Sequence, residues 1–150
     1  MAQSLASLHL HIVFSTWRRT EWIDDGVRPE LHAYIAGTLR NIKCAVQRMN
    51  SVEDHIHILM QLHRTKAVAD VLEEIKSSSS RWIKSRHERF ADFKWQAGYG
   101  AFAVSSSNVA AVCRYIDIQR EHHQARSFQD EYREILRRHG VAYDEQYVWD

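Results

Sequence analysis

The sequence predicts an α+β domain of the ferredoxin-like or RRM-like class, in which a split β-α-β motif forms a central antiparallel sheet with helices packed on one face. The main observation is the order of the periodic segments: stretches of alternating and of helical hydrophobicity follow one another as β-α-β-β-α-β. The second is composition, since 45% of the 150 residues are hydrophobic and no linker-like stretch interrupts them. We therefore expect one domain over residues 1–150, with a C-terminal helical extension over about residues 127–150.

The elements of the first half follow from their spacing. Residues 8–15 alternate apolar and mostly polar side chains, which is typical of a half-buried strand. Pro29 marks the start of a helix whose apolar residues recur at helical spacing as far as Ile42. Residues 44–62 are predicted to form a hairpin of two strands, with its turn around residues 50–51.

The second half continues the pattern and adds two helices. Apolar spacing predicts a long helix over residues 68–86, and residues 93–104 are predicted to hold one or two strands, broken at glycines. A third helix is expected over residues 108–123, and it carries one set of candidate functional residues. Ser127 with an acidic residue three positions later is a capping box that opens a fourth helix, which ends at Gly140.

Composition and charge narrow the function classes. The formal net charge is +1, and no apolar run approaches the roughly 20 residues of a membrane helix, so we expect no membrane partner. Two cysteines without metal-ligand spacing, and an N-terminus without a secretory pattern, favour a cytoplasmic protein. Residues 76–94 carry net +4 and residues 127–150 net −3, which is compatible with a polyanion site, but the charge pattern alone favours solvated helix faces.

Two histidine pairs are candidates for metal binding. Residues i and i+2 of a strand point to one face about 7 Å apart, so His55 and His57 can converge on one divalent ion. His9 and His11 have the same spacing on the first strand, which neighbours the third strand in a ferredoxin-like sheet. The alternative is that both pairs are ordinary strand histidines, and the spacing alone does not choose among these possibilities.

One face of the third helix offers a nucleophile. Tyr115, Gln119 and His122 fall at i, i+4 and i+7, apart from the apolar stripe. A tyrosine hydroxyl, with an ordinary pKa near 10, becomes an effective nucleophile where a metal polarises the phosphate that it attacks. The alternative is a half-exposed tyrosine hydrogen-bonded to a glutamine.

Three segments together resemble a known family. DHIHIL at residues 54–59, WQAGYGAFAVS at 95–105 and YIDIQREHH at 115–123 are similar to segments of the single-tyrosine HUH transposases of minimal insertion sequences, whose relatives include repeat-associated proteins. The likeness extends from about residue 8 to residue 148. The distinctive combination is two histidines around one hydrophobic residue, then Tyr-x-x-x-Gln about 60 residues later.

The resemblance implies a complete reaction. It implies that His55, His57 and Gln119 bind Mg²⁺ or Mn²⁺, and that Tyr115 cleaves and rejoins hairpin-bearing single-stranded DNA through a 5′-phosphotyrosine link. It also implies a homodimer. It gives no metal role to His9 or His11, which we expect to be strand residues near the site or DNA contacts.

The basic residues expected at DNA phosphates are Arg18, Arg19, Arg81 and Lys84. Three other functions fit parts of the pattern. A domesticated relative would bind DNA hairpins without transposition, and a metal-dependent phosphoesterase would use water in place of the tyrosine. A replication-initiation nickase is a further alternative, although such proteins usually carry further domains.

Overall fold

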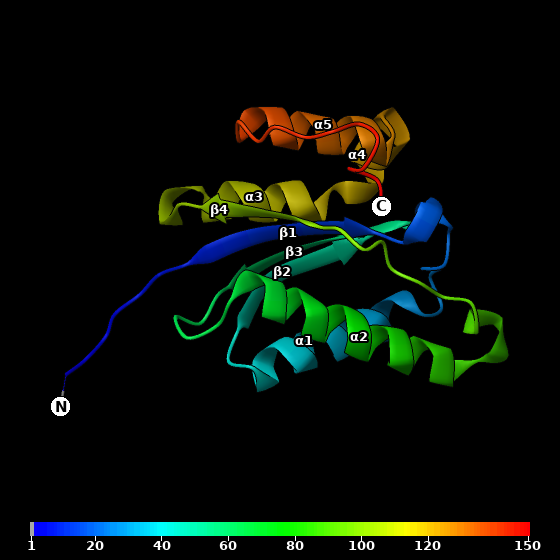
Figure 1. Cartoon of the computed structure of the whole chain (residues 1–150), viewed down its shortest axis with the longest axis horizontal. Coiled ribbons are helices and arrows are strands. Elements are labelled where there is room, and N and C mark those ends of the chain that lie inside the picture. Colours follow the sequence, from blue (N-terminus) through cyan, green and yellow to red (C-terminus); the bar gives the residue numbers. More distant parts are fainter. Residues whose placement is uncertain (1) are drawn as a thin grey trace.

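The computed structural model describes residues 2–150, except the side chains of residues 122 and 123, and confirms the predicted α+β class (Figure 1). His122, expected to share a helix face with Tyr115, therefore lies outside the described side chains. The strands are β1 (His9–Ser15), β2 (Ala45–Ser51), β3 (His55–Gln61) and β4 (Gly100–Val104). The α-helices are α1 (Arg28–Asn41), α2 (Val68–Arg86), α3 (Val109–Asp117), α4 (Gln119–Ala125) and α5 (Phe128–Arg138). Short 3-10 turns cover Trp17–Arg19, Glu88–Phe90 and Ser106–Asn108.

The four strands form one antiparallel sheet in the order β2-β3-β1-β4, the arrangement that a split β-α-β motif gives. Successive side chains of a strand alternate between the two faces. One face carries Ile12, Phe14, Ile56 and Ile58, which are fully buried beneath α1 and α2 in the main core. The other face carries His11, His55 and His57, so the sheet itself separates the core from the candidate site.

The second face of the sheet is covered by α3, α4 and α5, on the side opposite α1 and α2 (Figure 1). The helix α5 packs there through a small apolar cluster formed with one residue of β1 and one of β4. The members of this cluster are Val13, Phe102, Phe128, Tyr132, Ile135 and Leu136. Ser127 accepts a hydrogen bond from the backbone N–H of Asp130, and Gly140 has a φ of 64° just after the helix, as the capping signals predicted.

The predicted hairpin turn is wrong by a few residues. The strand β2 continues through Ser51, which pairs with Ile56, and the turn falls at residues 52–54. This register places Asn50 opposite His57, on the face that carries the site.

The predicted helix over residues 108–123 is also wrong, because it is two helices with a break at Ile118. The side-chain amide of Asn50 donates to the backbone carbonyls of Ile116 (2.9 Å) and Asp117 (3.4 Å). These carbonyls then have a partner outside the helix, so α3 can end there without leaving them unsatisfied. Gln119 thereby becomes the first residue of α4 rather than a residue of the α3 helix.

We expect Gly100→Ala to destabilise the protein, because α5 crosses β4 at this glycine. A Cβ at residue 100 would lie 2.8 Å from the Phe102 ring and 2.8 Å from the Tyr132 ring. Overpacking of this kind costs about 1–3 kcal/mol in free energy of unfolding. Gly37→Ala is the control: it lies inside α1 with no atom within 4 Å of its Cβ, and should stabilise by about 0.5–1 kcal/mol. Urea unfolding checks both, and similar changes in the two variants would contradict the packing of α5 on β4.

Candidate metal centre and tyrosine nucleophile

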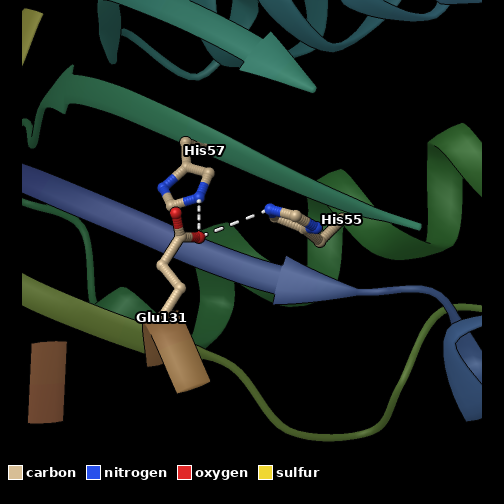
Figure 2. A group of neighbouring side chains, drawn as sticks. All are labelled: His55, His57 and Glu131. Carbon is tan, nitrogen blue, oxygen red and sulfur yellow. Dashed lines mark hydrogen bonds and ion pairs between the residues drawn. The ribbon is translucent and has the colours of Figure 1, made fainter. Parts of the chain in front are cut away.

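The two histidines of β3 converge on one carboxylate oxygen. The Nε2 atoms of His57 and His55 lie 2.9 Å and 3.4 Å from Oε1 of Glu131, and all three side chains are buried (Figure 2). One ligand atom from each of these residues can be chosen so that the three lie within 4.8 Å of one another. Two imidazoles and a carboxylate at this spacing can hold a divalent ion.

Glu131 is the functional candidate that sequence reasoning missed. It lies on α5, where the buried residues Phe128, Tyr132 and Ile135 form a stripe at helical spacing, and Glu131 falls within that stripe. A carboxylate on the buried face of a helix is unusual unless it is paired. Its position within this apolar stripe is the signal in the sequence that identifies it.

The second ring nitrogen of each histidine also has a partner. Nδ1 of His55 lies 2.8 Å from a carboxylate oxygen of Asp54, and Nδ1 of His57 lies 2.8 Å from Nε2 of His11. Such partners fix the tautomer and the ring orientation of a ligating histidine. His11 is buried beside His57, as expected for a strand residue near the site, whereas His9 is only half-buried and contacts Gln47.

The buried charges are balanced within the cluster. Burial opposes a charge on His55, but hydrogen bonds with the carboxylates of Asp54 and Glu131 outweigh it and raise its pKa to about 9. Burial would also raise the pKa of Glu131, yet hydrogen bonds with His55 and His57 hold it well below its ordinary value. Burial, together with the charge of His57, lowers the pKa of His11 to about 3, so His11 is neutral near pH 7.

Tyr115 reaches this cluster from α3. Its ring centroid lies 5.8 Å from that of His57 and 6.1 Å from that of His11, both in edge-to-face arrangement. Burial, followed by the charge of Glu131 and a hydrogen bond with it, raises the pKa of the Tyr115 hydroxyl. The structure therefore brings together the predicted nucleophile and the predicted histidine ligands within one chain.

Gln119 is fully buried beside Tyr115. Its Nε2 donates to the backbone carbonyl of Tyr115 (3.3 Å), and a hydrogen bond with Gln119 opposes the rise in the pKa of the Tyr115 hydroxyl. Its Oε1 is buried and has no hydrogen-bond partner among the side chains and backbone groups that the structure describes. An acceptor of this kind is costly to bury alone and suits a cation ligand.

The predicted DNA-contacting residues occupy two regions. Arg18 and Arg19 follow β1 directly, and the guanidinium of Arg18 lies 4.1 Å from the ring centroid of the exposed Trp17. Arg81 and Lys84 are exposed on α2, which covers the other face of the sheet, away from His57 (Figure 1).

The sequence profile of the family described as "Transposase IS200 like" matches residues 4–119 of the chain. The chain belongs to this family. The match includes His55, His57, Tyr115 and Gln119 and ends before α5, so Glu131 lies outside it. The resemblance stated from the sequence motifs is thereby confirmed at the level of the family.

Two solved structures show the same fold as this IS200-like transposase. A candidate transposase from Deinococcus radiodurans R1 aligns with a TM-score of 0.62 and 19% identity, covering 79% of this chain and 98% of that one. A REP-associated tyrosine transposase bound to a REP hairpin aligns with a TM-score of 0.60 and 15% identity, covering 82% of this chain and 74% of that one. A comparison with curated proteins gives no match. No helix within residues 2–150 combines the length and the apolar character needed to span a bilayer.

Proposed function

We propose that this IS200-like transposase cleaves and rejoins hairpin-bearing single-stranded DNA, with Tyr115 as nucleophile and a divalent metal at His55 and His57. The observation that carries the proposal is the placement of the tyrosine ring beside the buried histidine pair, 5.8 Å from His57. Membership of the family supports a DNA-processing enzyme. The similar structure that holds a REP hairpin supports a hairpin as the substrate class.

The residues present fit a divalent cation. Two imidazole nitrogens, the Glu131 carboxylate and the unpartnered Oε1 of Gln119 would provide a mixed nitrogen and oxygen ligand set for a divalent cation. The two oxygen ligands suit Mg²⁺ or Mn²⁺, the ions that the family resemblance implies. When bound, the ion supplies charge stabilisation at a non-bridging oxygen of the scissile phosphate. Asp54 and His11 hold the two imidazoles so that their Nε2 atoms face Glu131, where the ion would be held.

Tyr115 performs the bond exchange. Its Oη attacks the phosphorus in line, so that a bond from Oη to phosphorus forms while the bond from phosphorus to the 3′-oxygen breaks. Tyr115 loses its proton and the departing 3′-oxygen gains one, which leaves a 5′-phosphotyrosine and a free 3′-hydroxyl. A 3′-hydroxyl that later attacks such a link rejoins the strands without external energy, because the number of phosphodiester-type bonds is conserved.

The proposal also includes the DNA contacts, the cellular location and the oligomeric state of the protein. The DNA backbone would contact Arg18 and Arg19, where Trp17 also offers an exposed ring with the Lys94 ammonium 4.8 Å from its centroid. Arg81 and Lys84 would contact DNA only where it passes over α2, on the opposite face of the sheet. The protein would act in the cytoplasm as a homodimer. Light scattering on the purified protein tests the dimer directly.

The deciding experiment uses single-stranded oligonucleotides that span the DNA flanking the gene, incubated with the protein and Mn²⁺. We expect a protein–DNA adduct that resists denaturation and maps to Tyr115 by mass spectrometry. Cleavage without an adduct would instead support a phosphoesterase that uses water. Tight hairpin binding without cleavage in either Mg²⁺ or Mn²⁺ would support a domesticated binding protein.

A further prediction concerns His11 as a positioning residue for His57. If Nε2 of His57 ligates the metal, its Nδ1 carries the proton and donates to Nε2 of the neutral His11. We expect His11→Ala to weaken Mn²⁺ binding about 10-fold or more, measured by electron paramagnetic resonance. His11→Gln, which keeps an acceptor, should restore part of the affinity. His9→Ala, two residues away at the half-buried start of β1, is the matched control and should bind Mn²⁺ as the unaltered protein does.

A further inference from the structure

A cleft of about 360 Å³ opens between α3 and α5, beside the proposed nucleophile. Tyr115 and His11 are both among its lining residues, and the rings of both also approach His57. Most of the remaining lining is aliphatic and comes from three elements. These aliphatic residues are Ala103 and Val104 of β4, Ala111 and Val112 of α3, and Ile135 of α5.

Polar groups lie along the lining of the same cleft. The side chain of Asn108, at the start of α3, makes no capping hydrogen bond with the helix. Arg138 is largely exposed, and its only ion pair among the described residues is with Glu134 on the same helix. The ring of His139 is held in place by stacking on Phe102, with ring centroids 4.7 Å apart. The cleft thus combines apolar walls with amide and guanidinium donors.

We propose that this cleft binds the base of the nucleotide next to the scissile phosphate, a base of single-stranded DNA. The proposal rests on the proposed function, because it takes Tyr115 as the attacking group. A phosphate in position for attack lies within about 3.5 Å of the Tyr115 hydroxyl. The neighbouring base is joined to that phosphate through a single sugar, so it must lie close to the Tyr115 ring, where the cleft opens.

The chemistry of the lining selects a base rather than a second phosphate. Aliphatic side chains stabilise a planar, largely apolar base, whereas a phosphate in the same place would lose its hydration without enough paired donors. Asn108 and Arg138 have the donor patterns that recognise base edges. The cleft therefore gives the enzyme a means of selecting the nucleotide at the cut, in addition to the recognition of a hairpin.

The test is a scan of abasic sites, placed one at a time along an oligonucleotide from the DNA flanking the gene. Binding is measured by fluorescence anisotropy in Ca²⁺, with Tyr115→Phe present in every protein so that the ring stays and the strand is not cut. In the Tyr115→Phe protein with no other substitution, we expect one position, next to the scissile phosphate, at which loss of the base weakens binding. The expected effect is about 10-fold, as for the removal of one stacked base.

Ala111→Trp fills the cleft from α3. In this variant, binding of the intact strand should weaken about 10-fold, and the penalty at the flanking position should disappear. Ala110→Trp is the matched control, since Ala110 is exposed on the same helix and does not line the cleft. Ala111→Leu gives a smaller obstruction if the tryptophan variant fails to fold, and should reduce the same penalty in part.

The outcomes separate this proposal from the one on which it rests. If the protein with Tyr115 intact forms the adduct, but the abasic penalties are the same with and without Ala111→Trp, the cleft does not hold a base and the proposed function stands. If no oligonucleotide binds at all, the proposed function and the cleft proposal are both overturned.

Discussion

Tyr115→Phe should abolish the covalent adduct and reduce strand cleavage by roughly 10³-fold or more, because it removes only the attacking oxygen. The ring remains, and with it the contacts with His57 and His11. Hairpin binding and Mn²⁺ binding should therefore stay close to those of the unaltered protein. Denaturing gel electrophoresis of labelled oligonucleotides measures the loss.

Tyr143→Phe provides the matched control, since Tyr143 is partly exposed beyond α5 and contributes nothing to the site. It should form the adduct at the unaltered rate. Continued cleavage in Tyr115→Phe, with no adduct, would contradict a tyrosine nucleophile and indicate attack by water. An adduct on another tyrosine would show that the placement of Tyr115 beside the histidines is structural.

Sequence patterns predicted much of this fold because each element carries its own periodicity. The alternation in β1 and β3 depends on which face of the sheet is buried, and this directly places His55 and His57 on one side. The helix α5 could be predicted in the same way, because its capping box and its terminal glycine are local signals.

What the sequence could not show depends on contacts between distant residues. The break at Ile118 is stabilised by Asn50, which donates to Ile116 from 66 residues earlier in the chain, so the helical pattern of the segment does not predict it. The approach of Glu131 to His57 joins residues 74 positions apart. The family pattern stops at Gln119, so it could not provide this carboxylate either.

Glu131→Gln should weaken Mn²⁺ binding about 10-fold or more, while Glu134→Gln should leave it unchanged. Both residues lie on α5, but Glu134 pairs with arginines at the surface, whereas Glu131 faces the Nε2 atoms of the two histidines. Replacing a carboxylate with an amide keeps the size of the side chain and removes a negative charge from the ligand set. Electron paramagnetic resonance of bound Mn²⁺ gives the affinities of both variants.

Glu131→Gln should also change how the stability of the metal-free protein, measured in the presence of a chelator, depends on pH. The pKa of His55 is raised to about 9 in the folded protein, above its unfolded value near 6.5. Its pairing therefore stabilises the fold fully below about pH 6.5, and this contribution is lost as the pH rises through 9. The difference in unfolding free energy between the unaltered protein and Glu131→Gln should be about 1–3 kcal/mol at pH 6.5 and smaller at pH 9.5.

These two measurements together decide what Glu131 does. A metal ligand that also pairs with His55 in the metal-free protein should affect both the Mn²⁺ affinity and the pH-dependent stability. If Glu131→Gln lowers stability but binds Mn²⁺ normally, while Gln119→Ala loses Mn²⁺, the ion is held by the two histidines and Gln119. Glu131 would then be a structural counter-charge that fixes α5 over the site. If both variants lose Mn²⁺, all four side chains belong to one metal centre, assembled from β3, α4 and α5.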